Sequence, residues 1–311
     1  MILELIVCST DNGKRAVDVL GDRTGMSRLL AKKIRLYGRL LVDGLPARMI
    51  DPVRTGQSVR AIYGRETNGC RLRTVAGVNV LYADDWIIIV SKPPGMVTHP
   101  TYLHSTDGLT TNLSADPLHP VNRLDRDTSG LVVLAANGHA HHVLAHSDME
   151  KTYDGIVHGV FEPLSGRIDA PIGRARDSIM ERCVDWTDNG QRAATQYRTV
   201  RILDNGSFSQ VRFRLETGRT HQIRVHCQYA GHALIGDSLY PQKTDGLGKW
   251  IPDALDLEMG RQALHASGST FMHPVTGLVM SFHAGLPEDM CKLIRRAEAC
   301  HEQPWTHPPL P

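Results

Sequence analysis

The chain has 311 residues, of which 41% are hydrophobic and 22% charged, and its formal net charge is +2. This composition is that of an ordinary folded protein, and the length suffices for one large domain and one small domain. A net charge this small does not by itself indicate nucleic-acid binding. Only a local cluster of basic residues could indicate it.

The sequence carries no signal for a membrane or for secretion. Residues 1–7 lack a basic start and are too short an apolar run for a signal peptide, and later apolar runs such as 86–90 are far shorter than a membrane span. The six cysteines are scattered without a Cys-x-x-Cys pair, which favours reduced thiols over disulfides or zinc. We therefore expect a cytoplasmic protein.

A helix is predicted within residues 1–64, which we expect to form a separate small domain. Leu30 and Ile34 recur at helical spacing on one face, and Ser27 is a candidate N-cap. Gly38 is a candidate for a left-handed residue just past the last turn.

The opposite face of this helix is basic. Arg28, Lys32 and Arg35 lie two positions before the apolar residues, which places them roughly 200° around the helix. Such a stripe is either a solvated face or a surface that contacts phosphates, and the pattern alone favours neither. A strand over residues 40–42 then runs into Asp43-Gly44, which predicts a hairpin turn.

Residues 65–78 are predicted to be a linker to a larger domain at 79–298. Its first elements are two β-rich runs, 78–82 and 86–90, and the second ends in a Lys-Pro-Pro-Gly turn that cannot continue a strand. Residues 299–311 are rich in proline and are expected to be a tail on the surface.

The central feature of the larger domain is a charged loop over residues 120–130. It places the carboxylate of Asp125 between Arg123 and Arg126, and it closes with Thr-Ser-Gly before an apolar run at 131–134. Reactive groups are commonly mounted in this way, on a loop with a rigid buried strand behind it.

A helix that begins near residue 137 carries four histidines, which raises the question of a metal. They are His139, His141, His142 and His146. The only carboxylate in line with them, Glu150, lies beyond the expected end of the helix, and no cysteine is near. We interpret this cluster as a solvated polar face and predict no metal site.

Two strands and a helix complete the set of informative elements. Residues 151–157 alternate, with Tyr153 near the start, and residues 209–215 alternate cleanly between apolar and basic side chains. In the helix that follows, His221, Arg224 and Gln228 group on one flank and can face a cleft together.

These motifs resemble those of the RluA-type family of RNA pseudouridine synthases. The family's central motif reads His-Arg-Leu-Asp-x-x-Thr-Ser-Gly, which residues 122–130 match except that Asn122 replaces the histidine. Lys-x-Tyr at 151–153 resembles the second motif. Residues 217–226 match Thr-Gly-Arg-Thr-His-Gln-Ile-Arg-Val-His at ten consecutive positions. Residues 27–44 resemble the alpha-L RNA-binding motif.

The resemblance implies an α+β fold. It consists of a pseudouridine synthase catalytic domain, with a mixed, mainly antiparallel sheet, flanking helices and a central cleft, preceded by a small α+β RNA-binding domain. Asp125 is implied as the catalytic carboxylate and Arg224 as its salt-bridge partner. Tyr153 is implied to pack against the target base and is a candidate to take the C5 proton.

The resemblance also implies the partners of the protein. The substrate is structured RNA, either rRNA or tRNA, and the chain is expected to act as a monomer without a membrane, a cofactor or a metal. Arg123 would fill the gap that a flipped uridine leaves. The other residues implied in RNA contacts or motif support are Arg126, Arg219, His221, Arg28, Lys32 and Arg35. The sequence does not indicate which uridine is modified, or what Asn122 changes.

Two other functions are compatible with parts of this sequence. A catalytically silent RNA-binding protein would be favoured by loss of Asp125, Tyr153 or Arg224, and all three are present. A hydrolase with Asp125 and Asp127 as paired carboxylates is disfavoured, because the pair lies in a loop whose arginine-rich flanks suit a phosphodiester backbone.

Overall fold

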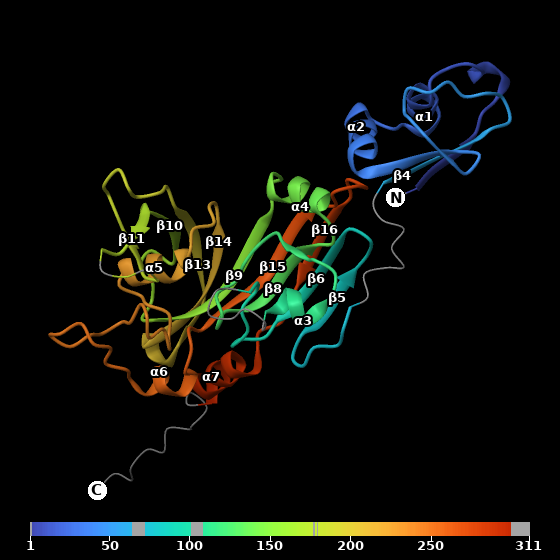
Figure 1. Ribbon diagram of the computed structural model, residues 1–311. Coiled ribbons are helices and arrows are strands. Elements are labelled where there is room, and N and C mark those ends of the chain that lie inside the picture. Colours follow the sequence, from blue (N-terminus) through green and yellow to red (C-terminus); the bar gives the residue numbers. More distant parts are fainter. Residues whose placement is uncertain (1, 64–71, 101–107, 177, 179, 300–311) are drawn as a thin grey trace, which may run out of the picture. The chain divides into compact units, whose positions relative to one another are not determined.

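The computed structural model describes residues 2–63, 72–100, 108–176, 178 and 180–299, and it divides into two compact units between Arg71 and Leu72 (Figure 1). Within these ranges no helix has the length and the apolar character that crossing a membrane requires. The linker at 65–78 and the tail at 299–311 stay predictions, because residues 64–71 and 300–311 lie outside the described part of the chain.

The N-terminal unit is a four-stranded antiparallel sheet with two helices, and its strand order is β1-β4-β2-β3. The elements are β1 (Ile2–Ile6), η1 (Ser9–Asp11), α1 (Ala16–Thr24), α2 (Arg28–Tyr37), β2 (Gly38–Val42), β3 (Leu45–Ala47) and β4 (Ser58–Tyr63). Buried apolar side chains of both helices, among them Leu20 and Ile34, supply the core of this unit.

Helix α2 begins after the predicted N-cap residue and exposes the predicted basic side chains. The Ser27 hydroxyl accepts a hydrogen bond from the amide of Leu30 at 3.1 Å, which satisfies one of the free amides of the first turn. Arg28, Lys32 and Arg35 are exposed on the outer side of the helix. The predicted basic face is therefore present on the surface of this unit.

The predicted left-handed conformation of Gly38 is wrong. Gly38 has an extended backbone, with φ −118° and ψ −162°, and it is already the first residue of β2. Glycine is required here because a Cβ would lie 2.3 Å from the carbonyl oxygen of Ile62 on the neighbouring strand. The turn at Asp43-Gly44 is confirmed, since both residues have positive φ and the hairpin pairs Val42 with Leu45.

The second unit is built on a ten-stranded mixed sheet. Eight strands follow the order β10-β13-β14-β9-β15-β8-β6-β5, β16 pairs with β15, and β7 pairs with β8. The β15–β8 pairing is parallel and the other pairings of this sheet are antiparallel. The predicted α+β architecture with a mixed, mainly antiparallel sheet is therefore confirmed.

Where the sequence predicts the bounds of a strand in this unit, as for 78–82, 86–90, 151–157 and 209–215, the observed bounds differ by at most two residues. The strands of the large sheet are β5 (Asn79–Ala83), β6 (Ile87–Lys92), β7 (His119–Pro120), β8 (Ser129–Ala135), β9 (Glu150–His158), β10 (Ser165–Asp169), β13 (Ala194–Leu203), β14 (Phe208–Leu215), β15 (Leu264–Met272) and β16 (Val279–His283), and a separate hairpin comprises β11 (Ile172–Arg174) and β12 (Arg182–Val184). The helices are α3 (Leu109–Leu113), α4 (Gly138–Ala145), α5 (Gln222–Tyr229), α6 (Ala254–Met259) and α7 (Glu288–Ala299), with a 3-10 turn, η2 (Asp204–Gly206).

Strand β8 provides the rigid support that the central loop needs. All of its residues, 129–135, are buried, and the apolar residues 87–90 of β6 beside it are buried as well. Each buried valine, leucine or isoleucine of these strands contributes about 1.5–3 kcal/mol when it leaves water. This double-sided burial explains why both strands read as continuous apolar runs rather than as alternating ones.

The polar sequence of the stretch 242–260 indicates a surface excursion, and residues 242–253 are exposed or half-buried as expected, but a short helix follows them. Residues 254–259 form α6, which is capped by Asp253 and packs beside α7 (Figure 1). Met259 is buried in a cluster with Met290 and Leu293 of α7. The helix has only six residues, of which Asp256 and Met259 are buried, and so short a run does not show the apolar periodicity of a helix.

Candidate active site

The loop that carries Asp125 joins β7 to β8 and is hydrogen-bonded by the buried side chain of Lys92. This lysine is 1% exposed, and its Nζ donates to the carbonyls of Pro93 at 2.9 Å, Met96 at 2.8 Å and Arg126 at 2.9 Å. Burial lowers the pKa of Lys92 to about 7, opposed by the charges of Asp127 and Asp125. The Lys-Pro-Pro-Gly turn and the central loop are thus tied together by one side chain.

The backbone just before Asp125 is fixed by Thr98. Its hydroxyl donates to the carbonyl of Leu124 at 3.0 Å and accepts from the amide of the same residue at 3.1 Å. Asn122 is fixed in a similar way, since its side chain donates to the carbonyl of Leu131 and accepts from the amide of Val133. Asn122 therefore supports the loop against β8 in this protein.

The Thr-Ser-Gly end of the motif is explained by the approach of β15. Gly130 has φ +112°, and a Cβ there would lie 2.3 Å from the carbonyl oxygen of Ala266. Ser129 lies beside it and hydrogen-bonds the Nδ1 of His265 at 2.9 Å. The motif glycine thus allows the close parallel pairing that aims the preceding loop.

The opposite wall of the site is the start of α5. His221 is its N-cap residue, with φ 58°, and the buried side chain of Gln222 accepts from the amide of Arg219 and donates to the carbonyl of Ala194. These bonds fix the first turn of α5 against β13. Arg224 lies on this turn and is 7% exposed.

Asp125 and Arg224 meet although 99 residues separate them in the sequence. The Nη1 of Arg224 donates to Oδ2 of Asp125 at 3.0 Å, and Nε2 of His221 lies 3.8 Å from Oδ1 of Asp125. The carboxylate keeps about a quarter of its surface exposed toward the cavity. A guanidinium in this position keeps a carboxylate ionised and oriented.

Arg224 also contacts two residues whose roles the sequence did not indicate. Its Nε and Nη2 donate to the carboxylate of Asp237 at 2.7 and 2.8 Å, and its guanidinium carbon lies 4.9 Å from the ring centre of Tyr240. Burial by itself lowers the pKa of Arg224, but the bonds to Asp237 and then the contact with Asp125 raise it above its ordinary value. Arg224 is therefore permanently charged.

Tyr240 sets the orientation of His221. The Tyr240 oxygen accepts from the amide of Arg182 at 2.8 Å and lies 2.8 Å from Nδ1 of His221. Burial raises the pKa of Tyr240 to about 12, so its hydroxyl keeps the proton and can donate it to Nδ1. That arrangement places the ring proton on Nε2, facing Asp125. Burial is also the main cause that lowers the pKa of His221.

Tyr153 lies at the floor of the same cavity, on the central strand β9. It is 6% exposed, and burial, followed by the charge of Asp125, raises the pKa of its phenol above the ordinary value. The phenol is therefore protonated at neutral pH. This state suits a packing surface for a base and is unfavourable for direct uptake of a proton.

One cavity gathers most of the predicted residues of the larger domain. The predicted residues that line it are Arg123, Asp125, Tyr153, Arg219, His221 and Arg224. Arg126 does not line it and instead forms an exposed ion pair with Asp127 at 3.1 Å. Gln228, which was expected to face the cleft with His221 and Arg224, does not line the cavity. Its amide donates to the carbonyl of Pro241.

The positions of Asp125 and Asp127 do not suit a paired-carboxylate hydrolase. Asp125 faces the cavity and Arg224, whereas Asp127 is bound to Arg126 and does not line the cavity. The two carboxyl groups therefore do not flank a common reacting bond.

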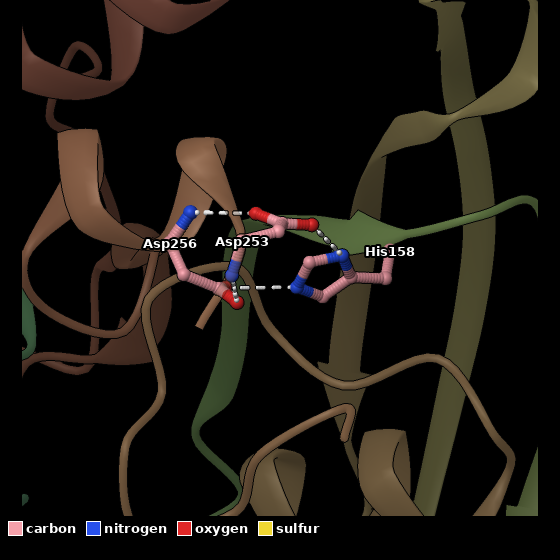
Figure 2. A group of neighbouring side chains, drawn as sticks. All are labelled: His158, Asp253 and Asp256. Carbon is pink, nitrogen blue, oxygen red and sulfur yellow. Dashed lines mark hydrogen bonds and ion pairs between the residues drawn. The ribbon is translucent and has the colours of Figure 1, made fainter. Parts of the chain in front are cut away.

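Among the described residues, one group of side chains is close enough to hold a metal ion, and it lies outside the cavity. His158, the last residue of β9, faces Asp256 of α6 at 2.9 Å and Asp253 at 3.6 Å (Figure 2). Asp253 also caps α6, and Asp256 accepts from the amides of Asp253 and Gly236. Hydrogen bonds within the fold thus engage both oxygens of Asp256, Nε2 of His158 and Oδ1 of Asp253, so we interpret the group as a clasp between β9 and α6.

The histidines of α4 behave as a polar face in the described part of the chain. His142 and His146 lie beside each other with ring centres 4.4 Å apart, and the ring of His146 contacts the carbonyl of His142. The side chain of His139 lies outside the described residues. No carboxylate completes a metal-binding group around the described histidines of this helix.

Comparison with known proteins identifies relatives of this chain. The family model described as RNA pseudouridylate synthase matches residues 86–229, which include the loop of Asp125, Tyr153 and the start of α5. The uncharacterized RNA pseudouridine synthase YjbO of Bacillus subtilis is 39% identical over 231 residues, which are 70% of this chain and 76% of that protein.

Further relatives and solved structures agree with this match. The ribosomal large subunit pseudouridine synthase D of Pseudomonas aeruginosa is 35% identical over 279 residues, 83% of each chain. The structure of human RNA pseudouridylate synthase domain containing 4 matches with a TM-score of 0.56 at 23% identity, over 71% of this chain and 93% of that chain. The likeness to the human structure shows the fold alone.

Proposed function

The chain belongs to the RluA-type family of RNA pseudouridine synthases and is an isomerase, and on this premise we propose that Asp125 is the carboxylate that converts uridines of ribosomal RNA into pseudouridine. The observation that carries the proposal is the buried guanidinium of Arg224, which contacts Asp125 inside a cavity that also contains Tyr153.

Ribosomal RNA is the substrate that the relatives support best. Proteins named as ribosomal large subunit pseudouridine synthase D are 37% and 35% identical to this chain in Zymomonas mobilis and Pseudomonas aeruginosa. Transfer RNA is the alternative within the same substrate class. Both are structured RNAs in which a uridine must leave the stack before an enzyme can reach it.

The reaction breaks the bond between C1′ and N1, turns the base, and joins C1′ to C5. N1 gains a proton and C5 loses one, so no redox equivalent is exchanged. We assign Asp125 to the sugar, where a carboxylate stabilises or attacks the electron-poor C1′ or accepts the hydrogen of C2′. Oδ1 is the oxygen available for this step, because Oδ2 is bound by Arg224.

The remaining residues of the cavity have supporting assignments. Tyr153 packs against the base, and its raised pKa favours a relay over the role of a primary base for the C5 proton. Arg123 is exposed at the rim, where it would enter the RNA stack in place of the flipped uridine. Unstacking costs a few kcal/mol, which such an insertion offsets in part.

The proposal is tested with purified protein and RNA labelled with tritium at C5 of uridine. Release of tritium from ribosomal RNA or transfer RNA fragments reports the exchange of C5 for N1. Asp125→Asn should lower the single-turnover rate by at least about 1,000-fold, equivalent to about 4 kcal/mol, while RNA affinity stays within about twofold. Retained turnover in this variant would refute the assignment.

A further inference from the structure

Asp237 is a buried carboxylate that lies behind the site and does not line its cavity. It is 2% exposed and follows Gly236 in the turn that precedes Tyr240. Its two oxygens take two of the three Arg224 nitrogens, at 2.7 and 2.8 Å, and leave Nη1 for Asp125 at 3.0 Å. We propose that Asp237 is a positioning residue of the reaction, which acts by fixing the guanidinium of Arg224.

The contact with Asp237 fixes which nitrogen of Arg224 faces Asp125. A guanidinium that was bound by Asp125 alone could rotate into a two-pronged pair and occupy both oxygens of that carboxylate. Asp237 prevents the rotation because it holds the Nε and Nη2 side of the fork, while the ring of Tyr240 packs against the guanidinium face. One oxygen of Asp125 is therefore left without a short hydrogen bond and faces the cavity.

The charges support the same conclusion. One guanidinium lies between two carboxylates, and the shorter contacts are those to Asp237. Arg224 therefore acts toward Asp125 mainly as a hydrogen-bond donor in a fixed position, because its positive charge also balances Asp237. A donor that is already in place does not need to reorganise when charge shifts during the reaction.

Asp237 also has a structural contact that the test must separate from this role. Its Oδ1 accepts from the amides of Leu239 and Tyr240, both at 3.1 Å, and so closes the turn that places the Tyr240 ring. A purely structural residue would affect folding and RNA binding together. A positioning residue acts through Arg224 and affects the rate of the chemical step.

This role of Asp237 rests on the proposed role of Asp125. It is tested by measuring single-turnover rates and RNA affinity of the full-length protein. Asp237→Asn should lower the rate about 10- to 100-fold with RNA affinity within about twofold. Combined with Arg224→Lys, which keeps the charge but not the fork, Asp237→Asn should cause little additional loss. If the two losses multiply instead, or if Asp237→Asn keeps the wild-type rate, the positioning role is refuted.

Two further variants keep the result interpretable. Asp154 is also a buried aspartate that binds an arginine through both oxygens, at 3.1 and 3.3 Å from Arg212, and Asp154→Asn should leave the rate unchanged. If Asp237→Asn does not fold, Asp237→Glu keeps the buried charge but displaces the guanidinium, and the same loss of rate is expected. An inactive Asp125→Asn beside a fully active Asp237→Glu would overturn the positioning role alone, whereas an active Asp125→Asn would overturn the proposed function.

Discussion

Asp125 is placed by contacts that come from far apart in the chain. Its loop is anchored by Lys92 and Thr98, and its carboxylate is met by Arg224. The motifs predicted that Asp125, Tyr153 and Arg224 share one site, and the structure places them around one cavity. The contacts of Arg224 with Asp237 and Tyr240 could not be predicted, because no local pattern reports which buried charge a distant guanidinium will bind.

Lys92 leads to a prediction about stability and pH. Burial lowers its pKa from 10.5 to about 7 in the folded chain, whereas the unfolded chain keeps the ordinary value. Between these values the unfolded chain binds a proton that the folded chain does not, and the neutral amine, which has two N–H groups, gives up one of its three bonds to carbonyls. The contribution of Lys92 therefore raises the free energy of unfolding as the pH rises through this window, and it is constant below pH 7.

Urea unfolding of the wild type and of Lys92→Met between pH 6 and pH 10 measures this contribution. The difference in free energy of unfolding, wild type minus variant, should rise by roughly 1 kcal/mol per pH unit above pH 7, because other groups cancel between the two proteins. A difference that stays constant or falls over that range would show that Lys92 does not titrate as its burial implies.

At the level of secondary-structure elements, the predictions succeeded where periodicity was strong. The strands β6, β8, β9 and β14 were expected from continuous or alternating apolar runs, and α2 from its spacing and its N-cap. Helix α6 was missed although its sequence contains a signal, since Asp253 and Asp256 form a capping box and Gly260 ends the helix. The conformation of Gly38 was not predictable because its cause is a neighbouring strand.

The basic face of α2 can be tested separately from catalysis. Replacing Arg28, Lys32 and Arg35 with glutamate should weaken RNA affinity about tenfold or more at low salt. The slope of log affinity against log salt should fall by roughly 0.7–0.9 for each RNA phosphate that the variant no longer neutralises. A matched reversal of three exposed arginines of the same unit, Arg15, Arg48 and Arg54, should change the slope little. An unaltered slope in the α2 variant would mean that its charges are only solvated.

The clasp between β9 and α6 makes a prediction about stability and metals. Asp253→Ala removes the side chain that accepts from the amides of Leu255 and Asp256, and it should lower the free energy of unfolding by about 1 kcal/mol. Thermal unfolding of the wild type should be the same with and without a chelator. A chelator-dependent midpoint that Asp253→Ala abolishes would show that the group of His158 holds a metal.

For the whole molecule, the fold and the reaction class followed from the order of the motifs, while the target RNA did not. The ten matching residues at 217–226 and the central loop identify the family, and relatives cover 70–83% of this chain. The choice of uridine depends on the shape of the RNA and on the surface that surrounds the cavity. A single chain without its RNA therefore does not indicate the modified position.

We propose that Asp125, oriented by Arg224, isomerises uridines in RNA. The most direct measurement maps pseudouridines in rRNA and tRNA from cells that lack this protein and are complemented with the wild type or with Asp125→Asn. We expect specific uridines to be modified with the wild type and to remain unmodified with the variant, at equal protein levels. Equal modification in both strains, or no position that depends on the protein, would contradict it.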